Sequence, residues 1–170
     1  MKDRGLTLPE LLVVITVMGI LGWLGCISGA ETLARQRVET ASRTLSQAIE
    51  HARSSALRNS EPCGMSLTSI GWEAPRSGAL PPCLAEITPL KGTGFGTGDL
   101  SVKHNMPSEL RFSSNGLVLD GGTVVLSSRG TSLRRCLVMA LPLGVVRLGR
   151  YGADPSESPD STACLPDDAL

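Results

Sequence analysis

The longest hydrophobic pattern in the chain is a run of twenty residues without a charge, from Leu11 to Ala30. Together with the residues just before it, it forms a segment of 25 residues, 6–30. As an α-helix that segment would be about 37 Å long, which exceeds the roughly 30 Å hydrocarbon core of a bilayer. Because Lys2 and Arg4 precede it, we expect the N-terminus on the cytoplasmic side and the rest of the chain outside. The pattern predicts a single transmembrane helix over residues 6–30.

A second hydrophobic pattern follows at once and has the period of an amphipathic helix. Apolar residues recur at steps of three and four, with charged residues between them, until Asn59 and Pro62 end the pattern. We expect one long helix with a transmembrane half (residues 6–30) and an amphipathic half (residues 31–59). The alternative is a membrane anchor followed by a separate helix, since the glycines around residues 22–29 would tolerate a break. The apolar positions are Val38, Ala41, Leu45, Ala48, Ile49, Ala52 and Ala56.

Residues 60–152 change to short apolar stretches divided by Gly, Pro, Ser and Asn, which predicts a small β-rich domain. The run from Cys136 to Met139 lacks alternation, which indicates a strand covered on both faces. The glycine-rich segment 91–99 lacks the order of a phosphate-binding loop and predicts a surface loop. The fold class is therefore α+β, with the long helix packed on a small antiparallel β-sheet domain. The predicted strands are Cys63–Leu67, Ile70–Glu73, Ala85–Leu90, Leu100–Lys103, Leu110–Phe112, Thr123–Ser127, Arg135–Ala140 and Val145–Leu148.

Charge separates the tail from the rest of the chain. The chain is formally neutral, but residues 153–170 carry five acids and no Lys or Arg, so residues 1–152 carry a net charge of +5. This Pro-, Ser- and Asp-rich tail is expected to be mobile except where Cys164 holds it. The excess of basic residues is too small to argue nucleic-acid binding from charge alone.

The cysteines and histidines suggest disulfides rather than a metal site or a catalytic site. Cys63, Cys83, Cys136 and Cys164 follow the apolar run without metal-ligand spacing, and an exported domain would oxidise them. Four cysteines allow three connectivities, of which we favour the nearest-in-sequence pairs, Cys63–Cys83 and Cys136–Cys164. His51 and His104 have no motif-spaced partners, and no pair of carboxylates is placed for acid–base chemistry. We expect no enzymatic activity, no cofactor and no metal.

The first residues, MKDRG followed by LTLPE, resemble the N-terminus of type IV pilins and pseudopilins. By that resemblance, a prepilin peptidase would cleave between Gly5 and Leu6 and then N-methylate Leu6. Leu6 departs from the Phe that most members carry. Glu10 matches the acid found five places after the cleaved glycine. An acid in an apolar helix is costly in lipid unless it is paired, so Glu10 is expected to pair with the terminal amine of a neighbouring subunit during assembly.

The second half of the chain is similar to the minor pseudopilin H and FimT group (GspH/FimT). The resemblance lies in the string ending the helix (residues 52–59), Gly71-Trp72, the segment 110–116 and the paired terminal strands. It implies a small periplasmic domain of two packed sheets on a pilin helix. It also implies a minor subunit that initiates, caps or modifies a type IV pilus or a type II secretion pseudopilus. The implied partners are other pilin subunits, the prepilin peptidase/N-methyltransferase, the inner-membrane assembly platform and the membrane itself, with the protein held in the bacterial inner membrane before assembly.

Two alternative functions remain. Some FimT-like proteins bind DNA through a basic C-terminal string, whose place here is residues 149–152, where one arginine is missing and acids follow. The second alternative is a single-pass anchored protein unrelated to filaments. A mature chain that still begins at Met1, or signal-peptidase cleavage near Ala30, would favour this alternative. The residues of a DNA patch would be Arg134, Arg135, Arg147 and Arg150, together with Arg129, and Tyr151 would stack on a base.

Overall fold

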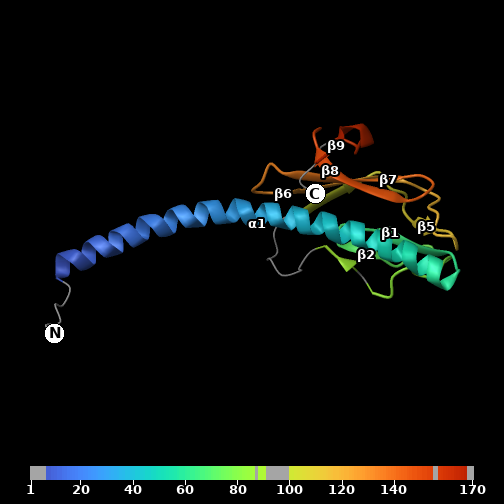
Figure 1. The fold of residues 1–170 in the computed structure, drawn as a ribbon, viewed down its shortest axis with the longest axis horizontal. Coiled ribbons are helices and arrows are strands. Elements are labelled where there is room, and N and C mark those ends of the chain that lie inside the picture. The colour runs from blue at the N-terminus through green and yellow to red at the C-terminus, as the bar shows by residue number, and fades with distance from the viewer. Residues whose placement is uncertain (1–6, 87, 91–99, 155–156, 168–170) are drawn as a thin grey trace.

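The computed structural model describes residues 7–86, 88–90, 100–154 and 157–167. A single helix, α1 (Leu8–Asn59), runs for 52 residues. Its second half lies along a two-sheet domain, and its first half projects away from that domain (Figure 1). The helix ends where Ser60 adopts a left-handed conformation, with φ of 53°. The predicted continuous helix is confirmed, and the alternative of two separate helices is wrong.

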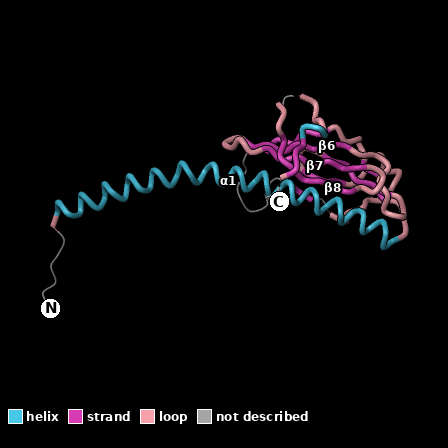
Figure 2. Tube along the Cα trace, turned by 45° about the horizontal axis from the view of Figure 1, so that its top comes forward, coloured by secondary structure: helices cyan, strands magenta, loops and turns pink. Residues whose placement is uncertain are grey.

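The domain contains two antiparallel sheets. The smaller sheet has the strand order β3-β2-β1-β5, built from β1 (Cys63–Leu67), β2 (Gly71–Glu73), β3 (Thr88–Pro89) and β5 (Leu110–Phe112). The larger sheet has the order β4-β6-β7-β8-β9, built from β4 (Leu100–His104), β6 (Gly122–Ser128), β7 (Arg134–Ala140), β8 (Val145–Tyr151) and β9 (Cys164–Pro166). A 3₁₀ turn, η1 (Ser161–Ala163), precedes β9. Figure 2 shows the strands of the larger sheet lying beside the second half of α1. The predicted α+β class, a long helix on antiparallel sheets, is confirmed.

Six of the eight predicted strands match the observed ones to within one residue at each end, and β8 extends three residues beyond the predicted Val145–Leu148. Of the strand predicted over residues 85–90, only Thr88–Pro89 pairs, and residue 87 lies outside the described residues. The predicted loop 91–99 also lies outside them. The short strand β9 was not predicted. The expectation that β7 is covered on both faces is confirmed, because five consecutive residues of this central strand, Arg135–Met139, are buried.

The main core lies between α1 and the two sheets. Each apolar position of the predicted amphipathic stripe is at most 6 % exposed and belongs to this core. Trp72 of β2, Phe112 of β5 and Leu137 of β7 meet the stripe from both sheets. Burying this stripe supplies most of the stability of the helix's second half, since tertiary packing contributes more than intrinsic helix propensity.

The C-terminal tail packs over the outer face of the larger sheet and forms a small second core. Val125, Cys136 and Tyr151 are buried there beneath Ala163 and Cys164. The Tyr151 hydroxyl accepts a hydrogen bond from the backbone N–H of Asp160. The expectation of a mobile tail is therefore wrong for residues 157–167, which are held by hydrogen bonds, by β9 and by packing as well as by Cys164.

Two disulfides join Cys63 to Cys83 and Cys136 to Cys164. They are the same nearest-in-sequence pairs that the sequence favoured. The first connects β1 to the segment that precedes β3. The second connects the centre of the larger sheet to β9, so it ties the tail to the domain.

The domain has two distinguishable ends along α1. At the first, which we call the entry end, the turn between β6 and β7 lies against the helix: a methyl group added at Gly130 would lie 3.6 Å from Cβ of Ala34. At the other, the distal end, a methyl group added at Gly116 would lie 2.8 Å from Cγ of Leu57.

Candidate functional site

The first half of α1 is apolar on all sides and is uncovered in the single chain. Five consecutive positions, 11–15, are exposed, and consecutive helical positions point in all directions around the axis. A helix that is hydrophobic all round needs cover from lipid or from other helices. The large apolar residues there, each 48–74 % exposed, are Leu8, Leu11, Leu12, Val13, Val14, Ile15, Val17, Met18, Ile20, Leu21 and Trp23.

No helix in the described part of the chain combines the length and the hydropathy that crossing a membrane requires.

Glu10 lies in the first turn of α1 and folds back over the start of the helix. Its Oε2 accepts hydrogen bonds from the backbone N–H of Thr7 at 2.9 Å and from the Thr7 hydroxyl at 2.7 Å. Both bonds end on one carboxylate oxygen, so the group keeps acceptor capacity for a further donor. The predicted cleavage site, Gly5 and Leu6, lies outside the described residues. Glu10 is nevertheless bonded to the residue that directly follows Leu6.

Thr7 is a part of this site that the sequence analysis missed. The pattern Thr7-x-x-Glu10 ahead of an apolar run is a capping-box signature, and it would have identified this pair. Thr7 and Glu10 are bonded to each other within one chain, at 2.7 and 2.9 Å.

The arginines proposed for DNA binding do not form one patch. Arg134 and Arg147 lie on the outer face of the larger sheet, whereas Arg135 and Arg150 lie on its inner face, as their strand register requires. Arg135 is 2 % exposed and Tyr151 is 4 % exposed, so neither presents the accessible surface that a phosphate or a base would need. Arg147, Arg150 and Arg129 are exposed. DNA binding stays an untested hypothesis.

Arg135 is held by two carboxylates from distant parts of the chain. Its guanidinium donates to Glu39 of α1 at 2.9 Å and to Asp167, which follows β9. Burial alone would lower the pKa of Arg135, but the hydrogen bonds and charges of Glu39 and Asp167 outweigh it and hold that pKa above its ordinary value. The arginine is therefore charged at neutral pH, and it links helix, sheet and tail.

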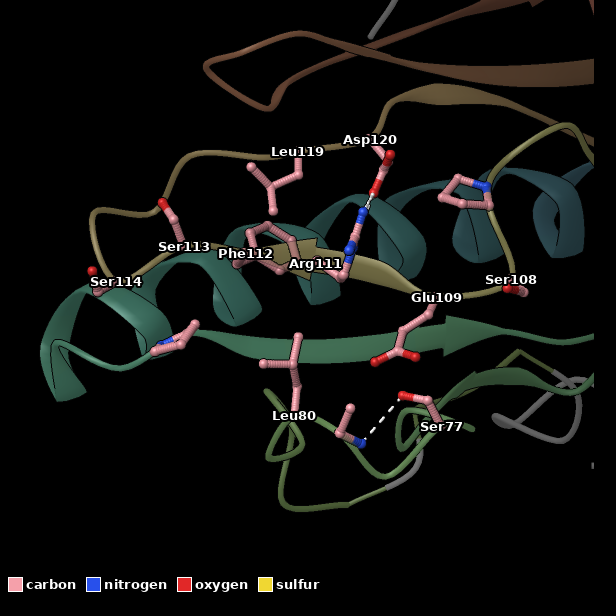
Figure 3. Close-up of a pocket in the computed structure, with 13 residues that line it drawn as sticks. Ser77, Leu80, Ser108, Glu109, Arg111, Phe112, Ser113, Ser114, Leu119 and Asp120 are labelled. Carbon is pink, nitrogen blue, oxygen red and sulfur yellow. Dashed lines mark hydrogen bonds and ion pairs between the residues drawn. The ribbon is translucent and has the colours of Figure 1, made fainter.

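A hollow of about 770 Å³ lies beside β5, and no pattern in the sequence predicted it (Figure 3). Leu80, Phe112 and Leu119 form its apolar wall. Arg111 pairs with Asp120 at 2.8 Å on its rim, and this hydrogen bond raises the pKa of Arg111. Oε1 of Glu109 is buried without a hydrogen-bond partner.

The histidines form no site with other ligands. His51 is exposed on α1, and Nδ1 of His104 is buried without a hydrogen-bond partner. Within the described ranges, no group of three or more His, Cys, Asp or Glu residues is arranged to hold a metal ion.

Comparisons with known proteins identify two matching regions. Residues 41–142 match the family described as type II transport protein GspH, and residues 1–24 match the prokaryotic N-terminal methylation motif. No curated protein matches the chain significantly. Among solved structures, the crystal structure of the type IV minor pilin FimU of Pseudomonas aeruginosa strain PAO1 is similar. It shares 20 % sequence identity at a TM-score of 0.49, over 75 % of this chain and 96 % of that one.

Proposed function

Because the chain belongs to the GspH family and carries the prokaryotic N-terminal methylation motif, we propose that it is a minor pilin or pseudopilin. Its role would be structural: to initiate, cap or modify the filament of a type IV pilus or a type II secretion pseudopilus. The observation that carries the proposal is the first half of α1, which exposes apolar side chains in every direction. Such a surface is stable in lipid before assembly and between neighbouring helices after it.

Processing would create the N-terminus that assembly needs. A prepilin peptidase would cut between Gly5 and Leu6, remove the basic leader and methylate the new amine on Leu6. The methylation motif at residues 1–24 supports this step. Before cleavage, Lys2 and Arg4 would hold the N-terminus on the cytoplasmic side of the inner membrane, with the β domain in the periplasm.

Glu10 would then select the position of the subunit in the filament. Its carboxylate already accepts two hydrogen bonds from Thr7 and can accept a third from the positively charged amine of a neighbouring Leu6. In an apolar surrounding, an unpaired charge is strongly disfavoured, so only the stagger that brings amine and carboxylate together would be stable.

The test is to replace Glu10 by Gln in the full chain and to measure incorporation into filaments. Glu10→Gln keeps the size and one hydrogen-bond acceptor for Thr7 but removes the charge, so membrane insertion should persist while incorporation falls at least about tenfold. Glu31→Gln is the matched control, because Glu31 is an exposed glutamate on the same helix. Normal incorporation of the Glu10→Gln variant would contradict the pairing.

Intact-mass analysis of the mature protein tests the processing separately. A mass that begins at a methylated Leu6 is expected. A chain that still begins at Met1 would refute the assignment to a filament and leave a membrane-tethered β-rich domain. A chain that begins near Ala30 would also refute it, because it would have lost the apolar segment that serves as the anchor.

A further inference from the structure

A polar hollow of about 520 Å³ opens at the entry end of the domain. Among the described residues that line it, the charged ones are Arg129 and Arg134, and five others carry hydroxyl groups. Guanidinium and hydroxyl groups are hydrogen-bond donors suited to an oxyanion such as phosphate. No acidic side chain is among these lining residues.

The strand register fixes part of this donor set. Ser101 of β4 lies opposite Ser127 of β6, and Ser127 lies opposite Arg134 of β7, so the three form one row on the outer face of the sheet. Neighbours in such a row have Cβ atoms about 5 Å apart, close enough to contact one small anion. Nη1 of Arg134 donates to the carbonyl of Ala153 at 2.9 Å, which orients the guanidinium and uses one of its five N–H groups.

The hollow lies at the level where a membrane surface would be. Gly130, in the turn that carries Arg129, is against Ala34 of α1. Ala34 is four residues beyond the end of the apolar run at Ala30, or about 6 Å along the helix. The headgroup layer of a bilayer extends roughly 5–8 Å beyond its hydrocarbon core. This step rests on the proposed membrane anchoring of the first half of α1.

We propose that this hollow binds the phosphate groups of anionic phospholipids in the periplasmic leaflet and so holds the domain on the membrane before the subunit is assembled. Arg35 and Arg37 lie on the adjacent turn of α1, where Arg35 is itself paired with Glu39 at 3.9 Å. Two nearby acids, Glu39 and Asp167, are paired with Arg135 and so oppose the attraction less. Asp154 directly follows Ala153, whose carbonyl accepts from Arg134, and is a further acid near the hollow among the described residues.

Hydrogen–deuterium exchange of the full chain in vesicles tests the proposal. The protein is reconstituted in phosphatidylcholine alone and in phosphatidylcholine mixed with phosphatidylglycerol, and the backbone amides of residues 128–133 are followed. In the anionic vesicles their exchange is expected to slow by about fivefold for each arginine engaged. The variants Arg129→Gln and Arg134→Gln, and the two combined, should remove this difference stepwise.

Arg147→Gln is the matched control. Arg147 is exposed on the same sheet, opposite Val138, which is four residues or about 13 Å along β7 from Arg134. In this variant, the amide exchange of residues 128–133 should differ between the two kinds of vesicle as much as it does in the wild-type chain. If Arg134→Gln disturbs the tail, which circular dichroism and exchange of β9 would reveal, Arg129→Gln alone carries the test.

Several outcomes would overturn the proposal. Equal exchange in the two kinds of vesicle would do so, as would a difference that survives in the double variant. Equal protection by inorganic phosphate added to neutral vesicles would assign the hollow to a soluble anion. Protection that appears only after other pilin subunits are added would assign it to a protein interface. Failure of the wild-type chain to float with neutral vesicles would instead refute the membrane anchoring, so the two failures are distinguishable.

Discussion

Arg135 on the inner face of β7 donates a 2.9 Å hydrogen bond to Glu39 of α1, across 96 residues of sequence. The arginine side chain is only 3 % exposed, whereas the Glu39 carboxylate is 27 % exposed. Asp167 accepts a second hydrogen bond from the same guanidinium. The Nε of Arg135 is buried without a hydrogen-bond partner. A single buried charge thus connects three parts of the chain that no local pattern brings together.

Replacing Arg135 by Leu should destabilise the protein. Removing one member of a buried pair costs about 3–5 kcal/mol, but here both acids keep contact with water, so we expect a loss of about 2 kcal/mol in the free energy of unfolding. Urea unfolding of the detergent-solubilised full chain measures it. Arg147→Leu, at an exposed position on the neighbouring strand, should change stability by less than about 0.5 kcal/mol. A similar small loss for Arg135→Leu would show that the buried connection contributes little.

Replacing Leu45 by Ala should open a cavity in the main core. Leu45 is 0 % exposed at the centre of the buried stripe of α1, and such truncations cost about 2–5 kcal/mol. Leu57→Ala is the control on the same helix, because Leu57 is 48 % exposed and should cost less than about 1 kcal/mol. The same unfolding measurement compares the two, and equal losses would mean that the second half of α1 is not packed as described.

Removing the Cys136–Cys164 disulfide should release the tail. The bond closes a loop over a sequence separation of 28, for which chain entropy predicts a stabilisation of about 3–4 kcal/mol. In a Cys136→Ala, Cys164→Ala variant, amide exchange in η1 and β9 should accelerate more than exchange in β6. Removing the Cys63–Cys83 pair instead should leave β9 protected. Unchanged protection of β9 in the first variant would show that its hydrogen bonds alone hold it.

Acidification should loosen the 3₁₀ turn η1 through Asp160. The pKa of Asp160 is lowered by hydrogen bonds from the backbone N–H and the hydroxyl of Thr162. A carboxyl whose pKa is lower in the folded state stabilises it fully above the unfolded-state pKa of about 3.9, and this contribution disappears as the pH falls through the folded value. NMR or amide exchange of residues 161–163 should therefore change below about pH 4.

Asp160→Asn is the control for that measurement. Asparagine keeps an oxygen that can accept from Thr162 but does not titrate in this range. The variant should show no acid transition at η1. A transition of the same size in the variant would place the responsible group elsewhere.

The helix and most strands could be predicted because their signals are local. The spacing of Val38, Leu45 and Ala52 fixes the buried face of α1, and Asn59 marks its end. The division into two sheets could not be derived from the residues themselves, because it depends on which strands pair. β9 was missed because a three-residue strand ending in Pro166, within an acidic segment, has no periodic pattern.

The candidate site residues likewise divide into those with a local sequence signal and those whose surroundings depend on long-range packing. Gly5, Leu6 and Glu10 could be proposed as site residues because their motif is continuous in sequence, and of these the structure describes only Glu10. That the arginines do not lie on one face was not foreseen, because neighbours such as Arg134 and Arg135 point to opposite faces of a strand. Tyr151 is buried by residues up to thirteen positions further along the chain, a contact that composition cannot foresee.

The short strand β9 covers what would otherwise be an open edge of the larger sheet. Without it, β8 would present seven residues of unpaired backbone at the border of the larger sheet. With it, that border ends in three residues that include Pro166, and the border of the smaller sheet at β3 ends in Pro89. Proline lacks the N–H that a foreign strand would need, so both borders discourage sheet-to-sheet fusion. Two of the four borders of these sheets are thus protected from pairing with a neighbouring β domain, and β4 and β5 form the other two.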